Sequence, residues 1–302
     1  MVLATNSMAT LYTHQSTNVT KTWILLTGFF VLVIGVGFVF SQAYGNSLIL
    51  YIAVAISIIM NVGSYWYSDK LVLKMVRAKP VTREEHMELW NIVENLSITA
   101  GLPMPKLYIV DDPSPNAFAT GRDKEHAAVA VHTGLLAILN KSELEGVLAH
   151  ELSHVGNRDT LVSTVVIVLV GFVTILSDFF LRTGHRFGGG GRDNKAQGIF
   201  LLIGFVLALL APLFAMMIQL AVSRKREFLA DASGALLTRY PEGLASALEK
   251  ISGAGIPSTT ANHATAHLYI ANPFGKGGAL NKLFMTHPPV TERIANLRDM
   301  AV

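Results

Sequence analysis

Residues 142–159 read SELEGVLAHELSHVGNRD. The first four, Ser142–Glu145, form a capping-box pattern that predicts the start of a helix. Within that helix, His150-Glu151-Leu152-Ser153-His154 places two histidines at positions i and i+4. Because such positions share one face of a helix, both imidazoles can reach a single metal ion. The buried face of the helix is predicted from apolar side chains at helical spacing, namely Leu144, Val147, Leu148 and Leu152.

Glu151 follows the first histidine directly, where its carboxylate can take a proton from water that the metal activates. Imidazole and carboxylate groups are typical zinc ligands, and a catalytic zinc site has three protein ligands and one open position. The motif therefore predicts one zinc ion per chain, bound by His150 and His154, with Glu151 as the general base. Asn157 and Asp159 follow the motif and are expected to cap or brace its helix.

A third zinc ligand has to come from another part of the chain. Glu227 and Asp231 lie four residues apart on a helix that is predicted after the last long apolar stretch. The two histidines lie just before the preceding apolar stretch, so an apolar hairpin would bring Glu227 near them. From spacing alone, two interpretations of Glu227 are equally good: it is a zinc ligand, or it is an exposed acid that pairs with Arg224 or Lys225.

The composition is that of a membrane protein with a water-exposed part. Of the 302 residues, 51% are hydrophobic and only 15% are charged, whereas about a quarter of an average soluble domain is charged. The formal net charge of +3 is the kind of excess that cytoplasmic loops carry, so it requires no nucleic-acid partner. The lack of cysteine excludes disulfides, thiolate zinc sites and cysteine nucleophiles.

Four apolar stretches are long enough to span a bilayer, which takes roughly 20 helical residues. They run from about Thr22 to Gln42, Ser47 to Ser68, Thr160 to Ser177 and Ala196 to Ser223. Residues 22–68 are predicted to form a transmembrane hairpin after a polar, poorly ordered tail over residues 1–21. Residues 160–223 are predicted to form a second hydrophobic hairpin, with the glycine run 188–191 in its loop.

Basic residues predict the orientation in the membrane. Five of them directly follow the second apolar stretch, which predicts that residues 69–159 face the cytoplasm: Lys70, Lys74, Arg77, Lys79 and Arg83. The loop between the third and fourth stretches is also basic, which conflicts with two further full crossings. The sequence leaves open whether those two stretches cross the bilayer.

The water-exposed part is predicted to be α+β and to consist of residues 69–159 and 224–302. Strands are predicted over Lys106–Val110, Ala117–Thr120 and Ala127–His132, and helices over Glu84–Ala100, Lys225–Arg239, Glu242–Ile251 and Thr291–Met300. The predicted fold is a mostly helical integral membrane protein with about four transmembrane helices. Its cytoplasmic catalytic domain is zincin-like and has a small β-sheet.

Four segments of the chain resemble the HtpX family of membrane-bound zinc metalloproteases, relatives of the CAAX prenyl proteases. They are NAFATG (Asn116–Gly121), AHELSHVGNRD (Ala149–Asp159), SRKREFLADA (Ser223–Ala232) and FMTHPP (Phe284–Pro289). The resemblance covers the chain in order and in hydrophobic layout, except for the first twenty residues.

The resemblance implies roles for individual residues. Glu227 matches the third zinc ligand, and Asp231 matches an acid that orients a zinc-binding histidine. His287 and Arg293 match basic residues that stabilise the oxyanion in the family. By its position alone, His287 is a turn histidine before two prolines.

The resemblance also implies a strand beside the active site. An extended substrate could pair with it through main-chain hydrogen bonds, which are indifferent to side-chain sequence. The residues that match this strand are Asn116, Ala117, Phe118, Ala119 and Thr120.

The expected function is that of a membrane zinc metalloendopeptidase. The third apolar stretch begins soon after His154, so cleavage is expected close to the bilayer surface, on misfolded or unassembled membrane proteins. The resemblance implies a stress-induced role in quality control in the bacterial inner membrane, and the basic residues predict that the catalytic domain faces the cytoplasm. Two alternatives are a CAAX-type protease of lipidated peptides, which would need more spans, and a non-enzymatic membrane protein with structural zinc. The oligomeric state is not predicted.

Overall fold

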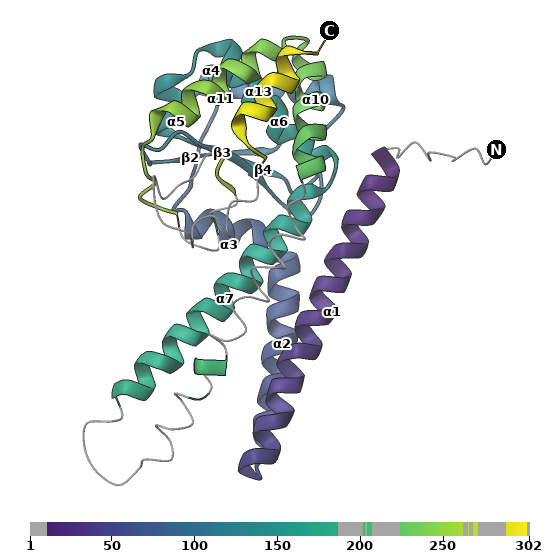
Figure 1. Ribbon diagram of the computed structural model, residues 1–302, viewed down its shortest axis with the longest axis vertical. Helices are drawn as coiled ribbons and strands as arrows, with labels where there is room; N and C mark the ends of the chain where they lie inside the picture. Colours follow the sequence, from purple (N-terminus) through teal and green to yellow (C-terminus); the bar gives the residue numbers. More distant parts are fainter. Residues whose placement is uncertain are drawn as a thin grey trace, which may run out of the picture.

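The computed structural model describes residues 11–186, 202, 204–206, 224–261, 265, 268–270 and 288–300. A domain of helices around a small sheet lies at one end of the molecule, and three long helices extend from it (Figure 1). Two of these, α1 (Leu11–Tyr44) and α2 (Leu48–Trp66), form a hairpin. The third, α7 (Asp159–Arg186), leaves the domain on the same side.

The hairpin contains the two helices of the described part that are long and apolar enough to cross a membrane. The candidate spans are Ser16–Gln42 and Leu48–Trp66. Residues 11–21 belong to α1, so the prediction of a poorly ordered tail through residue 21 was wrong for this part. The polar side chains of Asn18 and Thr22 are buried in the protein, and this packing extends the helix beyond the apolar stretch.

The second hydrophobic region differs from the predicted pair of spans. Helix α7 continues through Asp178, whose carboxylate lies 2.8 Å from the Arg182 guanidinium one turn later. Its apolar part qualifies as a candidate span only together with the preceding helix α6 (Lys141–Gly156), and the two helices meet at 84°. Most of the fourth predicted stretch, residues 196–223, and all of the glycine run 188–191 lie outside the described residues. The described residues thus supply two candidate spans, or three if α6 and α7 form one broken span.

The sheet has the strand order β1-β2-β4-β3. Strands β2 (Lys106–Val110) and β4 (Ala128–His132) are parallel, and the outer strands β1 (Lys79–Pro80) and β3 (Ala117–Thr120) pair with them in antiparallel fashion. The three predicted strands are present, and the short β1 is the one strand of the described residues that was not predicted. Strand β3 therefore forms one edge of the sheet, and this edge faces the site described below.

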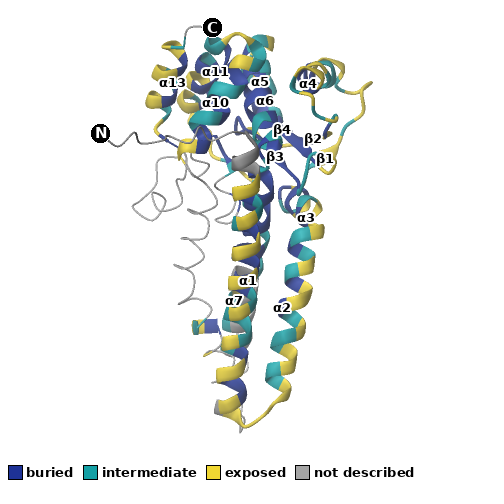
Figure 2. Cartoon of the chain, turned by 90° about the vertical axis from the view of Figure 1, so that its right-hand side faces the viewer, coloured by how far each residue is buried: buried dark blue, intermediate teal, exposed yellow. Residues whose placement is uncertain are grey.

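Alternation along the strands builds a separate core on each face of the sheet. On β4, Val129 and Val131 pack with helices α4 (Met87–Ala100), α6 and α11 (Pro241–Ala254). Ala128 and Ala130 point to the opposite face, where Phe118 packs against helix α7 and the N-terminal part of α1. Because successive side chains of a strand point to opposite faces, the sheet joins a core of the sheet domain to a core shared with the long helices. Figure 2 shows the buried residues concentrated where the two parts meet.

The remaining helices of the described part are α3 (Ser68–Met75), α5 (Thr133–Ile138), α10 (Arg224–Thr238) and α13 (Val290–Arg298). The first two were not predicted, and the last two lie within two residues of the predicted bounds. The mostly helical α+β architecture with a small sheet is confirmed.

The start of α6 differs from the prediction, because the capping box lies two residues earlier. The Asn140 side chain accepts a hydrogen bond from the Glu143 backbone N–H at 3.0 Å. The Glu143 carboxylate accepts one from the Asn140 N–H at 2.9 Å. Glu143 also binds Lys250 of α11 at 2.7 Å, and this contact favours Glu143 over Glu145 as the capping acid.

Candidate metal centre

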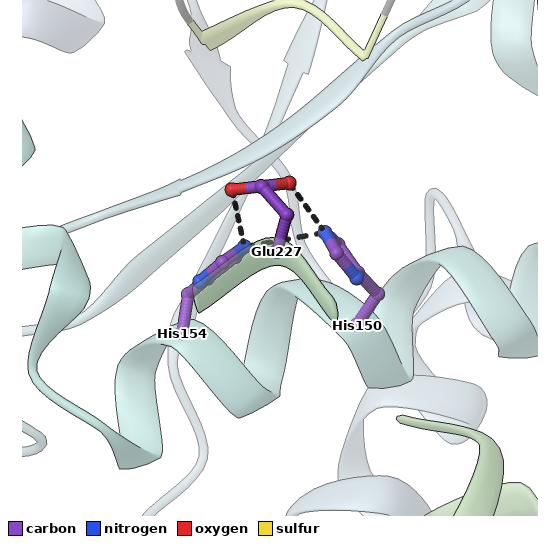
Figure 3. Close-up of side chains that lie close together, drawn as sticks. All are labelled: His150, His154 and Glu227. Atoms are coloured by element: carbon purple, nitrogen blue, oxygen red, sulfur yellow. Dashed lines mark hydrogen bonds and ion pairs between the residues drawn. The ribbon is translucent and has the colours of Figure 1, made fainter. Parts of the chain in front are cut away.

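Three potential metal ligands converge beside strand β3. His150 and His154 project from one face of α6, and Glu227 reaches them from the first turn of α10 (Figure 3). The two histidine Nε2 atoms lie 3.2 Å apart. The Glu227 carboxylate oxygens lie 3.7 Å from the His150 Nε2 and 3.6 Å from the His154 Nε2. The structure therefore places Glu227 with the histidines and not at the surface with Arg224 or Lys225.

The spacing of these ligand atoms suits a zinc ion. A tetrahedral zinc site with bonds of about 2.1 Å places its ligand atoms roughly 3.4 Å apart. The three observed separations lie on either side of that value, and the three ligand atoms all lie within 4.8 Å of one another. Two neutral imidazoles and one carboxylate are also the donor set expected of a catalytic zinc. The residues present thus fit the metal that the sequence predicts.

Close backbone contact between α10 and α6 makes this convergence possible. A Cβ atom at Gly234 of α10 would lie 2.9 Å from the His150 backbone nitrogen, so only glycine allows the helices to approach this closely. On the other side, a Cβ at Gly146 of α6 would lie 2.7 Å from the Leu244 nitrogen of α11. Gly234 thus allows the α10 carboxylates to approach the histidines, and Gly146 allows α11 to pack closely against the metal helix.

His150 is oriented from the side of the sheet domain. Its Nδ1 lies 2.9 Å from an Asp231 oxygen, which leaves Nε2 toward the ligand cluster. Arg293 of α13 holds Asp231 by donating two hydrogen bonds, from Nε at 2.8 Å and from Nη2 at 2.6 Å. Burial opposes ionisation of Asp231, but Arg293 and His150 outweigh it and lower the pKa of the carboxyl. Asp231 therefore stays anionic behind His150.

His154 is oriented by the start of helix α7. Its Nδ1 lies 3.0 Å from an Asp159 oxygen, at the first residue of α7. The other Asp159 oxygen accepts a hydrogen bond from Arg226 at 3.3 Å. The sequence predicted that Asp159 caps or braces the metal helix, but it did not indicate the Arg226 contact. An acid five residues after the second histidine was the only available signal.

Glu151 lies in the same pocket as the ligand cluster. It is 6% exposed, and one carboxylate oxygen accepts a hydrogen bond from the Ala119 N–H at 2.9 Å. This contact fixes the carboxylate between the metal helix and strand β3, next to the two histidines. A carboxylate in this position can accept a proton from a molecule bound in the pocket.

Strand β3 exposes part of its backbone to this pocket. The Asn116 C=O accepts a hydrogen bond from the His132 N–H, so residue 116 turns its backbone toward β4. Because the pattern alternates, the backbone groups of Ala117 and Ala119 point to the free edge. The side chain of Asn116 instead holds residues 268–270, through the Leu268 C=O and the Ile270 N–H.

The other predicted strand residues have distinct surroundings. Phe118 and Ala119 line the pocket, with Leu268 and Ile270 forming the rest of its apolar wall. Thr120 shares a hydrogen bond with Thr164 of α7 at 3.1 Å and so ties the strand to that helix. The strand thus supplies both backbone groups and apolar surface to the site.

Of the two predicted basic residues, the structure describes Arg293 but not His287. Arg293 is 1% exposed and lines the pocket. Its Nη1 has no hydrogen-bond partner among the described residues and lies 3.9 Å from Glu227. His287 lies outside the described residues.

Comparisons with known proteins identify the family of this chain. Residues 83–301 match Peptidase family M48. A protein named Protease HtpX homolog from Caldanaerobacter subterraneus subsp. tengcongensis is 45% identical over 299 residues, covering 97% of this chain and 99% of the relative. Another of that name, from Tropheryma whipplei, is 47% identical over 290 residues, covering 96% and 98% of the two chains.

A solved structure shows the same fold at low sequence identity. The crystal structure of S. mikatae Ste24p matches with a TM-score of 0.51 and 18% identity, over 96% of this chain and 67% of that one. The two HtpX homologs confirm the resemblance found in the four sequence segments over nearly their full length. The chain belongs to peptidase family M48 and, within it, to the HtpX proteases.

Proposed function

We propose that this chain is a membrane-bound zinc endopeptidase that cleaves misfolded or unassembled membrane proteins in the bacterial inner membrane. The observation that carries the proposal is the convergence of His150, His154 and Glu227 beside the Glu151 carboxylate. Membership of a metallopeptidase family supports the hydrolysis of peptide bonds. The candidate spans of α1 and α2 support a membrane setting.

The ligand cluster and Glu151 divide the chemistry between them. A zinc ion held by His150, His154 and Glu227 would supply the Lewis acid that polarises the peptide carbonyl and acidifies water. Glu151 accepts one proton of the attacking water on its carboxylate and donates it to the nitrogen of the leaving amine. A carbon–oxygen bond forms and the carbon–nitrogen bond breaks, without a covalent bond to the chain.

Strand β3 is the proposed binding edge for the substrate. The outward backbone groups of Ala117 and Ala119 offer main-chain hydrogen bonds to an extended peptide. The Ala119 N–H is bound to Glu151 in the free enzyme, so this contact supports the base before the substrate arrives. Phe118, Leu268 and Ile270 favour an apolar side chain near the scissile bond. Main-chain recognition with an apolar wall suits unfolded membrane segments.

Arg293 is proposed to stabilise the oxyanion through Nη1, which has no hydrogen-bond partner among the described residues, while its other two nitrogens hold Asp231. The guanidinium would hold Asp231 and face the oxyanion at the same time without moving, and preorganised donors of this kind are effective in catalysis. His287 stays a proposed second donor, on the strength of the family resemblance alone.

The proposed orientation places the sheet domain in the cytoplasm, on the basis of the basic residues that follow α2. A reporter enzyme that is active only in the cytoplasm, inserted at residues 188–191, tests the crossing of the second hydrophobic region. Two full crossings predict no activity at this position. Cytoplasmic activity there would exclude the model with four crossings.

The deciding experiment compares the detergent-purified, zinc-loaded full chain with Glu151→Gln on an unfolded protein substrate. The substitution keeps the size of the side chain and all three zinc ligands, so equal zinc content is the internal control. Loss of the general base is expected to reduce the rate by about 10²–10⁴-fold. Equal rates for the two proteins would contradict the proposal.

Two further arms separate the alternatives. A prenylated peptide, assayed in parallel, is expected to be no better a substrate than its unmodified form, and a strict requirement for the lipid would favour the CAAX-type alternative. Removal of zinc by a chelator is expected to abolish activity with little loss of folded protein. Unfolding on chelation, together with inactivity of the zinc-loaded chain, would favour a structural zinc.

A further inference from the structure

The N-terminal part of helix α1 reaches the rear of the metal site. Asn18 lies in the first turn of the candidate span Ser16–Gln42 and is only 2% exposed. A buried amide costs free energy unless its donors and acceptor are satisfied. The contacts of the Asn18 side chain therefore indicate the role of α1 beside the metal site.

The Asn18 amide bridges three residues from two other parts of the chain. Its Nδ2 donates to the Asp159 Oδ1 at 2.8 Å and to the Asn157 C=O at 3.1 Å. Its Oδ1 accepts from the Arg226 Nη1 at 3.4 Å. Both ends of the amide are thus engaged.

Asp159 connects this amide to the metal ligand. One Asp159 oxygen accepts hydrogen bonds from Asn18 and Arg226, and the other lies 3.0 Å from the His154 Nδ1. An unbroken chain of contacts therefore runs from Asn18 through Asp159 to the ligand His154. The position of the carboxylate decides which way the imidazole Nε2 points.

Asn18 also holds the corner at which the metal helix ends. Asn157 is the C-cap of α6, and the next residue, Arg158, has a φ of 59°. This corner turns the chain by 84° into α7. Because Asn18 binds the Asn157 carbonyl as well as Asp159, it fixes both the corner and the acid that begins α7.

We propose that Asn18 is a positioning residue of the metal site, which makes α1 part of the metal-binding unit in addition to a membrane anchor. Asn18 acts by holding the Asp159 carboxylate in place behind His154. This inference rests on the proposed function, because it takes His154 as a zinc ligand. Without the Asn18 amide, Asp159 keeps Arg226 as a partner but loses its shortest hydrogen bond.

The test measures zinc affinity, which does not require activity. The full chain in detergent competes with a chromophoric chelator for zinc, and Asn18→Ala is compared with Asp159→Ala and with the double variant. Asp159→Ala is expected to weaken zinc binding by about 10–100-fold, as is usual for a partner of a ligating histidine. Asn18→Ala is expected to weaken it by about tenfold, the equivalent of one net hydrogen bond.

The double variant shows whether Asn18 acts on zinc binding through Asp159. If Asn18 acts through Asp159, the double variant binds zinc about as weakly as Asp159→Ala alone, because the two effects are not additive. Thr20→Ala is the matched control, since Thr20 is exposed on the same helix and, among the described residues, its hydroxyl bonds to the Ser16 carbonyl of that helix. It is expected to leave zinc affinity unchanged. Thermal unfolding of the metal-free proteins records any separate loss of stability.

A milder variant covers the case in which Asn18→Ala does not fold. Asn18→Ser keeps a hydrogen-bond donor on a shorter side chain, and its zinc affinity is expected to lie between those of the wild type and Asp159→Ala. The inference would be overturned if Asn18→Ala bound zinc as tightly as the wild type. If the alanine variant does not fold, wild-type affinity in Asn18→Ser would overturn it in the same way. Additive effects in the double variant would also contradict it. A wild type that binds no zinc would overturn the proposed function, and this inference with it.

Discussion

The two histidines of the metal site are held by two different parts of the molecule in the same way. Behind each Nδ1 stands an aspartate, and behind each aspartate stands an arginine. For His150 the pair is Asp231 and Arg293, both from the sheet domain. For His154 the pair is Asp159 and Arg226, at the junction with the long helices.

These two aspartate–arginine pairs brace the histidines, and the two braces differ in the number and length of the contacts between acid and arginine. Arg293 binds Asp231 with two nitrogens, and its side chain is 1% exposed. Arg226 offers Asp159 one nitrogen at 3.3 Å, with a side chain that is 10% exposed, and the neutral amide of Asn18 completes the contact. Bidentate charged pairs are stronger and more directional than single contacts. The comparison indicates a rigid brace on the domain side and a weaker one that depends on the membrane helix.

The largest expected effect comes from removing the two arginines in turn. Arg293→Ala leaves the Asp231 charge buried without its main partner, which is expected to cost about 3–5 kcal/mol of unfolding free energy. Arg226→Ala is expected to cost less, because Asn18 still donates to Asp159. Denaturant unfolding of the metal-free proteins in detergent measures both. Equal losses would show that the two braces do not differ in the way their geometry indicates.

A smaller effect is expected from widening the gap between α10 and α6. Gly234→Ala places a methyl group against the His150 backbone, with an expected cost of about 1–3 kcal/mol. Because Glu227 and Asp231 both move with α10, zinc affinity is expected to fall as well. Gly253→Ala of α11 meets open space and is the control, expected to stabilise by roughly 0.5–1 kcal/mol. A neutral Gly234→Ala would mean that α10 is not in close contact with the metal helix.

The domain side also contains an acid whose contribution depends on pH. Burial alone would raise the pKa of Asp112, but hydrogen bonds from the Ser114 N–H and from Ser258, Thr260 and Thr259 lower it to about 2. These bonds tie residues 258–260 to the turn after β2.

Since the pKa is lower in the folded state, the stabilisation by Asp112 is complete above the ordinary value near 4 and is lost as pH falls through about 2. It amounts to about 2 kcal/mol. Metal-free wild type is therefore expected to lose about that much relative to Asp112→Asn between pH 5 and pH 2, as measured by the shift in thermal midpoints. Parallel pH curves would contradict the role of Asp112. Zinc affinity at neutral pH is expected to be unchanged in Asp112→Asn, because Asp112 touches neither brace.

Local patterns explain most of what the sequence predicted correctly. The three main strands are short, mostly apolar runs, and the helix bounds follow from apolar spacing over single segments. The capping box was misplaced by two residues because Asn140 and Ser142 are both good caps, and the choice depends on the contact of Glu143 with Lys250 of another helix. The count of four spans relied on hydropathy alone, which says nothing about where α7 bends away from α6 or packs against α1 and α2.

Local sequence patterns were sufficient to place the two histidines on one helix face, to set the glutamate beside them and to predict the apolar character of α1 and α2, because each depends on spacing within a few turns of one helix. The packing of distant segments settles which histidine Asp231 contacts and which one Asp159 contacts, and it brings Asn18 to the same cluster. Asn18 lies in a polar run that the sequence assigned to the tail, and it is 141 positions away from Asp159 along the chain. Contacts between such distant segments arise from how the helices pack, and no pattern of residues along one segment encodes them.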